Sequence, residues 1–359
     1  MIIKRRFDKN INGEICIAKV FGKTVYVVDV DNTSASIDYL NQPIAAHINV
    51  SDSCNLHCHY CYAVGSKKKN EMSYKNYCIC IDKLADAGVL SLTWSGGEPF
   101  LNPFFIDLLS YANEKSLYNV ILSNATLISD ETAAFLSTIG AQVQVGLNEI
   151  WSNKRSNLLI QEIDGYKRLL DNGVNVIATV MIDYKPDVSP ETIINYLLSN
   201  NIFNVRFGFM VLEGQMGDFA QKKEYICYAR HTMEALHKLG TKLNVMFQDD
   251  TIEYESSLFS RRALSCEGAT LELYVDSNGD IYPCPLLKHH SEFYSGNILK
   301  DNIQDVWNGK VFSSFRNISF KDTGCEKCNY ICGTWCRALS YSYTGLIFGK
   351  NPFCLKEEA

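Results

Sequence analysis

The 359-residue chain has no apolar run near the about 18 residues that a membrane-spanning helix needs. Its first residues, MIIKRRFDKNINGE, carry charges and lack the apolar core of a secretory signal. The net charge is −6, and no basic block typical of nucleic-acid binding is present. No solenoid-type repeat or low-complexity segment is visible. These absences predict a cytoplasmic globular protein without a membrane or nucleic-acid partner.

Cysteine, in contrast, is abundant, with 14 residues in the chain. Disulfides are rare in the cytoplasm, so metal or cluster ligation explains this number better. Three cysteines gather near residue 54, and seven follow from Cys266 onward. Cys78 and Cys80 lie in an apolar helical run and are interpreted as packing residues. Most of the cysteines therefore fall into two groups of candidate ligands.

Strand-like and helix-like segments alternate from residue 45 to about residue 240. This alternation predicts parallel βα units, and six units suit a partial TIM-like barrel or an open doubly wound sheet. The expected strands are 45–51, 89–95, 118–124, 141–147, 174–182 and 203–211. The expected helices are 73–87, 103–115, 130–139, 157–172, 190–200 and 218–240. The segments CNLHCHYC, SGGEP, SNAT and GLNE come at or just after strand ends, so we expect them to face one mouth.

The flanking segments differ from this repeating part. Residues 1–44 form an N-terminal β-rich arm, with strand-like stretches at 14–20 and 23–30, too short for an independent leader-binding domain. The barrel is expected over 45–240 and a connector over 241–265. From 266 to 359, short strands, tight turns and dense cysteine predict a small second domain.

The first cysteine group has the spacing C-x3-C-x2-C, formed by Cys54, Cys58 and Cys61. Three thiolates on one short loop can bind three irons of a [4Fe–4S] cubane and leave the fourth iron open for a chelating cofactor. A zinc site that also uses His57 and His59 is the alternative. Five candidate ligands within eight residues would crowd a tetrahedral zinc ion, so the cluster is favoured.

A second motif, Gly96-Gly97-Glu98-Pro99, follows the second expected strand. Alone it reads as a helix-entry turn. Paired with the cysteine loop, it resembles the radical S-adenosylmethionine (SAM) superfamily. The resemblance implies a cluster whose unique iron is chelated by the amino and carboxylate groups of SAM. It also implies that Gly96 and Glu98 bind the ammonium, with Gly97 in the same segment, and that Tyr60 lies near the adenine; glycine admits close backbone approach, and a carboxylate matches an ammonium.

The same resemblance suggests weaker cofactor contacts. Asn124 in SNAT occupies a polar turn that lies near the cofactor in relatives. The fourth strand ends in GLNE where many relatives have SLDG, and Asn148 could replace the usual ribose contact. Arg155 could reach the SAM carboxylate or be a solvated loop charge. Phe209 and Met210 could line the adenine pocket or belong to the core.

The C-terminal cysteines follow a distinct pattern. Residues 276–280, DSNGD, predict a hairpin turn, and a C-x2-C-x3-C-x3-C string comes later. A zinc ribbon would leave three of the seven unused, whereas two iron–sulfur clusters use seven or eight. The seven are Cys266, Cys284, Cys325, Cys328, Cys332, Cys336 and Cys354.

This array resembles the SPASM domain, the two-cluster extension of peptide-modifying radical SAM enzymes, and residues 301–307 resemble its helix before the string. One gap is x3 where the family usually has x5. The resemblance, which covers residues 45–354, implies an inner cluster on Cys266, Cys284 and Cys336. Its fourth position is an open iron or a non-cysteine ligand such as Asp276, Asp280 or His289. The outer cluster would be held by Cys325, Cys328, Cys332 and Cys354.

The resemblance implies a radical SAM oxidoreductase with SAM and three [4Fe–4S] clusters, one for SAM and two auxiliary. Such an enzyme cleaves SAM reductively to a 5′-deoxyadenosyl radical, with electrons from an external donor such as flavodoxin or ferredoxin. We expect it to abstract hydrogen from a ribosomally made precursor peptide and form a thioether, carbon–carbon or ether crosslink. Formylglycine formation, as in sulfatase maturases, and modification of a small molecule such as a tetrapyrrole remain alternatives. A non-enzymatic zinc- or cluster-carrying interaction protein is disfavoured by GGEP. No catalytic base is assigned. Glu213 and Asp218 follow the sixth expected strand and could face the mouth, but solvated loop charges are the better interpretation.

Overall fold

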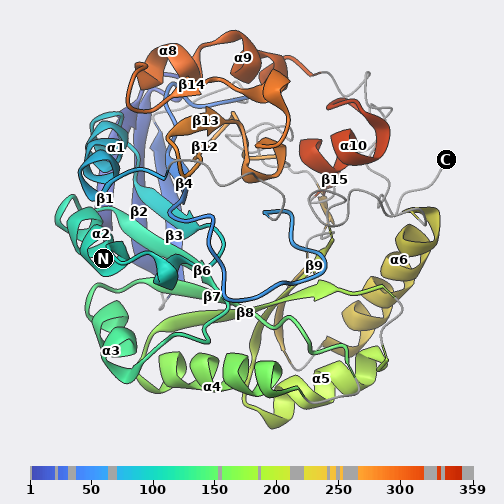
Figure 1. Ribbon diagram of the computed structural model, residues 1–359. Coiled ribbons are helices and arrows are strands. Elements are labelled where there is room, and N and C mark those ends of the chain that lie inside the picture. The colour runs from blue at the N-terminus through green and yellow to red at the C-terminus, as the bar shows by residue number, and fades with distance from the viewer. Residues whose placement is uncertain are drawn as a thin grey trace.

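The computed structural model describes residues 2–20, 23–30, 38–63, 71–152, 156–184, 187–210, 222–240, 243–247, 251–253, 266–318, 330–332 and 336–349. Its main feature is a ten-stranded sheet in the order β10-β9-β8-β7-β6-β5-β4-β12-β13-β14. The sheet curves into an open barrel surrounded by helices (Figure 1).

The barrel is built from consecutive βα units with parallel strand pairing. The strands are β4 (Ala45–Asn49), β5 (Ser91–Ser95), β6 (Tyr118–Ser123), β7 (Gln142–Gly146), β8 (Asn175–Ile182) and β9 (Asn204–Phe209). The helices are α1 (Tyr74–Asp86), α2 (Phe105–Glu114), α3 (Asp130–Thr138), α4 (Asn157–Asp171), α5 (Pro190–Ser199) and α6 (Lys222–Leu239). The predicted α/β partial barrel is therefore confirmed. Separately, among the described residues no helix is long and apolar enough to span a membrane.

Serine caps define where several of these helices begin. The hydroxyl of each cap accepts a hydrogen bond from the backbone N–H three residues later, which satisfies a donor that the first turn leaves without a helical partner. These bonds are 3.1–3.4 Å long and involve Ser73, Ser129, Ser156 and Ser189.

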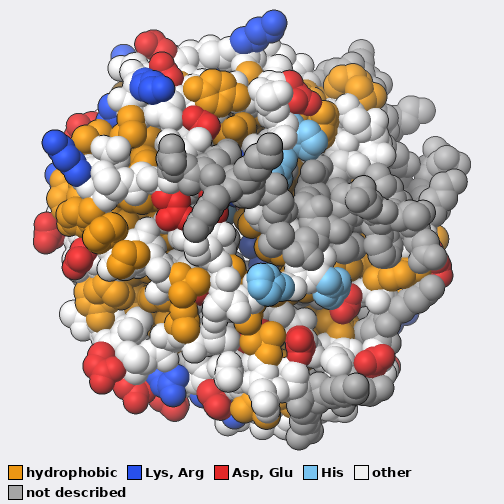
Figure 2. Space-filling model, viewed as in Figure 1, with side chains coloured by type: hydrophobic (Ala, Val, Ile, Leu, Met, Phe, Trp, Pro, Cys, Tyr) orange, Lys and Arg blue, Asp and Glu red, His pale blue; other side chains and the backbone are white. Residues whose placement is uncertain are grey.

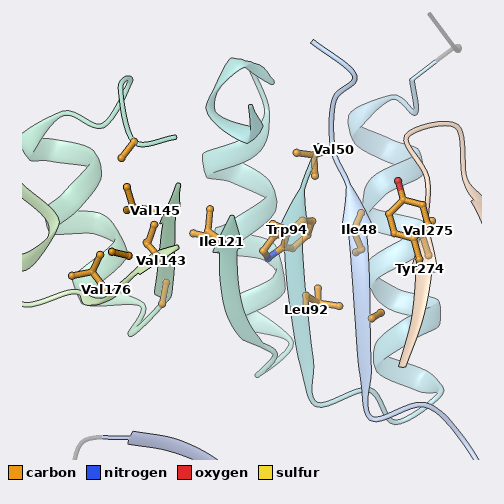
Figure 3. Packing of buried hydrophobic residues seen from close by; sticks show 14 of the residues in the cluster. Ile48, Val50, Leu92, Trp94, Ile121, Val143, Val145, Val176, Tyr274 and Val275 are labelled. Atoms are coloured by element: carbon orange, nitrogen blue, oxygen red, sulfur yellow. The ribbon is translucent and has the colours of Figure 1, made fainter. Parts of the chain in front are cut away.

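The core lies between the strands and the surrounding helices. Alternate residues of the strands, such as Leu92 and Trp94 of β5 and Ile121 of β6, point into it (Figure 3). The Trp94 indole donates a 2.7 Å hydrogen bond to Asn119, so this large ring is buried without an unsatisfied N–H. Cys80 is fully buried and Cys78 packs against the same core, as predicted for packing residues.

The N-terminal arm is an antiparallel sheet of β1 (Ile2–Asp8), β2 (Gly13–Val20) and β3 (Lys23–Val30). The expected hairpin is present as β2 and β3, and β1 is an additional strand. Its apolar face packs against Ile44, Leu90 and Tyr118, which lie at the starts of barrel strands. The arm therefore covers the end of the barrel opposite the strand carboxyl ends.

The C-terminal part continues the barrel sheet. Strand β12 (Glu272–Val275) pairs in parallel with β4, and β13 (Asp280–Tyr282) and β14 (Gly296–Asn297) follow with antiparallel pairing. The predicted hairpin turn thus joins β12 to β13. Helices α8 (Ile303–Trp307), α9 (Lys310–Arg316) and α10 (Arg337–Thr344) complete this part.

Two short strands lie where the sequence predicted a connector. Strand β10 (Asn244–Phe247) pairs in parallel with β9 and extends the barrel sheet. Strand β11 (Thr251–Glu253) pairs with β15 (Tyr330–Cys332). These strands were not predicted, because a strand of three or four residues has too few residues to show a periodic pattern.

Candidate functional site

The first cysteine group lies on the loop that follows β4, at the carboxyl end of the barrel. Cys54, Cys58 and Cys61 are all half-buried free thiols. Burial, together with the charges of Cys61, Glu162 and Cys54, raises the pKa of Cys58 to about 12. The three thiols are therefore near enough to influence the pKa of one another.

The geometry of this loop bears on the zinc alternative. His59 is engaged elsewhere, since its Nε2 lies 2.9 Å from Asp183 Oδ1. In a cubane each thiolate binds a different iron, so the donor set fits an iron–sulfur cluster better than a single zinc ion.

The glycine motif anchors the start of the cysteine loop. The N–H of Gly97 donates to Ser51 O at 2.7 Å, and that of Glu98 donates to Ser53 O at 2.8 Å. A Cβ on Gly97 would lie 2.2 Å from Ser53 O and 2.9 Å from Cys54 Cβ, which is closer than real atoms approach. Glycine at this position therefore lets the end of β5 pack directly against the cluster loop.

The side chain of Glu98 is buried at this contact and does not face solvent. Its carboxylate is 1% exposed and accepts bonds from Ser123 Oγ at 2.8 Å and from the Asn124 N–H at 2.9 Å. It also caps the 3-10 helix η1 (Pro99–Leu101) through the Phe100 N–H at 3.3 Å. Burial raises its pKa, and these hydrogen bonds oppose the shift. In the structure Glu98 joins the ends of β5 and β6, and its contact with a SAM ammonium stays a prediction.

The cysteine loop is also attached to the end of β6. Asn124 Nδ2 donates to Asn55 Oδ1 at 2.9 Å, and Asn55 Nδ2 donates to Thr126 Oγ1 at 2.8 Å. Asn124, predicted near the cofactor, thus lies against the loop itself. Together with the bond from His59 to the residue after β8, these contacts hold the loop across the barrel mouth, where Figure 2 shows a central hollow with histidine side chains beside it.

Tyr60 contacts the end of β7. Its hydroxyl donates to Asn148 Oδ1, and burial raises its pKa well above the usual value. Asn148 in turn contacts the buried carboxylate of Glu162 on α4. The sequence analysis missed Glu162, although an acid on the buried face of an amphipathic helix was a readable signal.

The remaining predicted site residues are either part of the core or outside the described residues. Phe209 and Met210 are 0% and 1% exposed and belong to the hydrophobic core. Arg155, Glu213 and Asp218 lie outside the described residues.

The second cysteine group is partly described. Burial raises the pKa of Cys284, and the charges of Cys336 and Cys266 raise it further. The three thiols assigned to the inner cluster are therefore near enough for their charges to influence the pKa of Cys284. Cys332 lies on β15, and Cys325, Cys328 and Cys354 lie outside the described residues.

The suggested fourth ligands of this group have other partners. Asp276 is fully buried and accepts 2.9 Å bonds from Asn49 Nδ2 and Tyr274 OH. Asp280 accepts from Asn278 at 2.7 Å and from Asn297 at 3.0 Å, one bond on each oxygen. His289 Nε2 lies 2.8 Å from the backbone oxygen of Tyr62. These contacts favour an open fourth position over the three alternatives.

Buried polar groups join the two cysteine regions. Lys288 Nζ lies 3.5 Å from Asp276 Oδ1 and 3.8 Å from Asp52 Oδ1. Asn49 Nδ2 donates to both carboxylates, at 2.9 and 2.8 Å, and Ser277 Oγ donates to Asp52 at 2.9 Å. We call these five residues the latch; it fixes the segment before Cys54 to the β12–β13 hairpin.

Comparison with known proteins agrees with this arrangement. The radical SAM superfamily model matches residues 48–198, and that of SPASM, an iron-sulfur cluster-binding domain, matches residues 266–329. Sporulation killing factor maturation protein SkfB of Bacillus subtilis is 25% identical over 291 residues, covering 77% of this chain and 67% of SkfB. AdoMet-dependent heme synthase of Methanosarcina barkeri is 24% identical over 346 residues, covering 88% of this chain and 97% of that protein.

The fold is shared with solved structures. Streptococcus suis SuiB bound to S-adenosylmethionine has a TM-score of 0.70 at 20% identity, covering 89% of this chain and 79% of SuiB. SuiB bound to precursor peptide SuiA matches with a TM-score of 0.64 at 20% identity, covering 82% of this chain and 71% of SuiB. The matched families use SAM and iron–sulfur clusters, for which the gathered thiols supply suitable ligands. Residues 48–198 of the chain therefore form a radical SAM domain, and residues 266–329 form a SPASM domain.

Proposed function

We propose that this protein is a peptide maturase that modifies a ribosomally made precursor peptide, most readily by forming a thioether, carbon–carbon or ether crosslink. The observation that carries the proposal is the loop of Cys54, Cys58 and Cys61, held across the barrel mouth by contacts with the ends of β5 to β8. When bound there, the cluster and SAM supply a radical that removes a hydrogen atom from an unactivated C–H bond.

The chain's own residues supply the setting for this chemistry. Gly97 and the backbone of Glu98 fix the start of the loop, so the three thiols are presented together. Tyr60 and Asn148 form the wall of the mouth beside the loop, and we assign both to SAM. The N-terminal arm covers the opposite end of the barrel, which leaves the carboxyl ends of the strands as the route for substrate.

The auxiliary thiols complete the proposal. Cys266, Cys284 and Cys336 would hold an inner cluster with one open position. An outer cluster would be held by Cys325, Cys328, Cys332 and Cys354, which with the SAM cluster gives three clusters in all. The inner group lies next to the mouth, because the latch ties its hairpin to the cysteine loop. An auxiliary cluster there could accept an electron from the substrate or bind a substrate thiolate. The external electron donor would be a flavodoxin- or ferredoxin-like protein.

The names of the relatives support a peptide substrate. SkfB is named as a maturation protein, and SuiB has been solved with its precursor peptide. One observation favours a second candidate, a small molecule of the tetrapyrrole class: the match covers 97% of the heme synthase but 67% of SkfB. The two candidates differ in what must enter the mouth and can be separated by direct assay.

The test begins with anaerobic reconstitution, followed by incubation with SAM and dithionite. We expect 5′-deoxyadenosine to form, and a small peptide encoded next to the gene to lose two hydrogens by mass spectrometry. Fragmentation separates a crosslink from an oxidised residue such as formylglycine, and a porphyrin precursor serves as the parallel substrate. Replacing Cys54, Cys58 and Cys61 together with Ala should abolish iron binding at this loop and all 5′-deoxyadenosine. Wild-type turnover in that variant would refute the proposal, and conversion of the porphyrin alone would refute the peptide substrate.

A further inference from the structure

Glu162 is an acid in an apolar position. It lies on the face of α4 that packs against the barrel, among the buried residues Leu159, Ile163 and Tyr166, and is itself fully buried. A buried carboxylate without partners is strongly unfavourable, so its hydrogen bonds show what it does. Burial raises the pKa of Glu162 to about 8, while hydrogen bonds from Asn148 oppose that shift.

Both oxygens of Glu162 are bonded to Asn148. The backbone N–H of Asn148 donates to Oε2 at 2.9 Å, and its side-chain Nδ2 donates to Oε1. The same Nδ2 also lies 3.3 Å from Gly146 O. The two amide hydrogens of Asn148 therefore point at Glu162 Oε1 and Gly146 O. Both carboxylate oxygens act as acceptors, as they do in the ionised form that prevails above the pKa of about 8.

This pairing fixes the orientation of the Asn148 amide. A flipped amide would place Oδ1 against the acceptor oxygens of Glu162 and Gly146, which is repulsive. In the bonded orientation Oδ1 faces the hydroxyl of Tyr60, which must then be the donor. The carboxylate thus determines, through one amide, how a tyrosine of the cysteine loop is held.

The carboxylate is also close to the cysteine site. Asn148 links it to Tyr60, which lies between Cys58 and Cys61 in the sequence. Helix α4 can approach this closely because Gly165, one turn along, has no side chain: a Cβ there would lie 2.2 Å from Ala125 O. The position of Glu162 behind the mouth is therefore set by backbone packing.

We propose that Glu162 is a positioning residue of the SAM site, which locks the Asn148 amide so that Tyr60 is held as a donor against the cysteine loop. The inference rests on the proposed function, since it is there that Asn148 and Tyr60 are assigned to SAM. Glutamine cannot replace the carboxylate, because its single acceptor oxygen can take the Asn148 backbone N–H while its NH₂ group would force the amide to flip.

The test measures SAM binding without a reductant, so that no turnover is needed. Equilibrium dialysis of the reconstituted protein is carried out at pH 9, where Glu162 is ionised. We expect Glu162→Gln to raise the dissociation constant about tenfold at unchanged iron content. Glu162→Leu, which suits the apolar face of α4, should also raise the dissociation constant about tenfold. This variant provides the test if the glutamine variant unfolds. Tyr166→Phe, on the same buried face but outside the Asn148 contacts, is the matched control and should bind SAM as wild type does.

A double-mutant cycle distinguishes positioning from a general packing effect. Because Glu162 acts through Asn148, Glu162→Gln should add nothing further in an Asn148→Ala background. Additive losses, or an unchanged dissociation constant in both Glu162 variants, would overturn the inference. A wild-type protein that carries its cluster but does not bind SAM would instead refute the proposed function.

Discussion

Replacing Lys288 with Met removes a buried ammonium from the latch. Its Nζ is 3.5 Å from Asp276 Oδ1 and 3.8 Å from Asp52 Oδ1, and the three side chains are 2%, 0% and 7% exposed. Solvent therefore screens these charges little. Without the ammonium, two carboxylates that share the Asn49 amide would remain buried with like charge.

The size of the effect follows from this burial. Removing one partner of a buried ion pair costs about 3–5 kcal/mol, because the remaining charge is left without compensation. The unfolding entropy of a 359-residue chain is about 0.75 kcal/mol per kelvin on the average per-residue scale. We therefore expect Lys288→Met to lower the melting temperature by about 4–7 °C.

The assay is anaerobic calorimetry of the reconstituted protein at neutral pH. Lys115→Met is the control, since Lys115 forms a shorter 2.6 Å pair with Asp82 but both side chains are 39% exposed. It should shift the melting temperature by less than about 1 °C. A double variant with Asp276→Asn should recover part of the loss, because one of the two facing charges is removed. If Lys288→Met shifted the melting temperature no more than Lys115→Met, the latch would not stabilise the fold as described.

Three further changes test the site and the fold. Gly97→Ala forces a Cβ to within 2.2 Å of Ser53 O, so we expect reconstituted iron content to fall severalfold; full iron content would show that the loop can move aside. Burial and a nearby lysine lower the pKa of His47 to about 3. The free energy of unfolding therefore falls as the pH drops below about 6.5, the pKa of histidine in the unfolded chain, by at most about 1.4 kcal/mol per pH unit. His47→Gln, which can retain a bond to Ser95, should flatten urea-unfolding stability between pH 6.5 and 5, and an unchanged slope would contradict the assignment. Cys284→Ala should lower iron content and peptide product while 5′-deoxyadenosine still forms, and normal product would remove the inner cluster from the mechanism.

The barrel could be predicted because its signals are local. Strands such as β5 and β8 are short segments rich in residues that favour strands. Ser129 and Ser189 mark the starts of helices by their own hydrogen bonds. Each unit repeats the same alternation of strand and helix. An error in the predicted end of one strand or helix therefore does not change the predicted topology. The cysteine spacing was equally readable, because three ligands on one loop need no knowledge of distant segments.

The side-chain contacts of the site could not be predicted in the same way. Glu98 was expected to face a ligand, yet its partners Ser123 and Asn124 belong to the next βα unit. Glu162 acts on Tyr60, 102 residues earlier, through Asn148. Such networks depend on which strand ends meet at the mouth, which periodicity does not specify.

The pairing of β12 with β4 has a mechanical consequence for the two cysteine groups. The register joins Ala45 to Glu272 and Ile48 to Val275, so the loop that carries Cys54 and the hairpin that leads to Cys284 leave adjacent strands of one sheet. Adjacent strands lie only about 4.8 Å apart, and their backbone hydrogen bonds resist sliding. The latch adds side-chain contacts at the same edge, where Asp52 and Asp276 follow the two strands. The separation of the two thiol groups is therefore set by sheet backbone and a buried ion cluster. A substrate held at the mouth would therefore lie at a fixed distance from both groups.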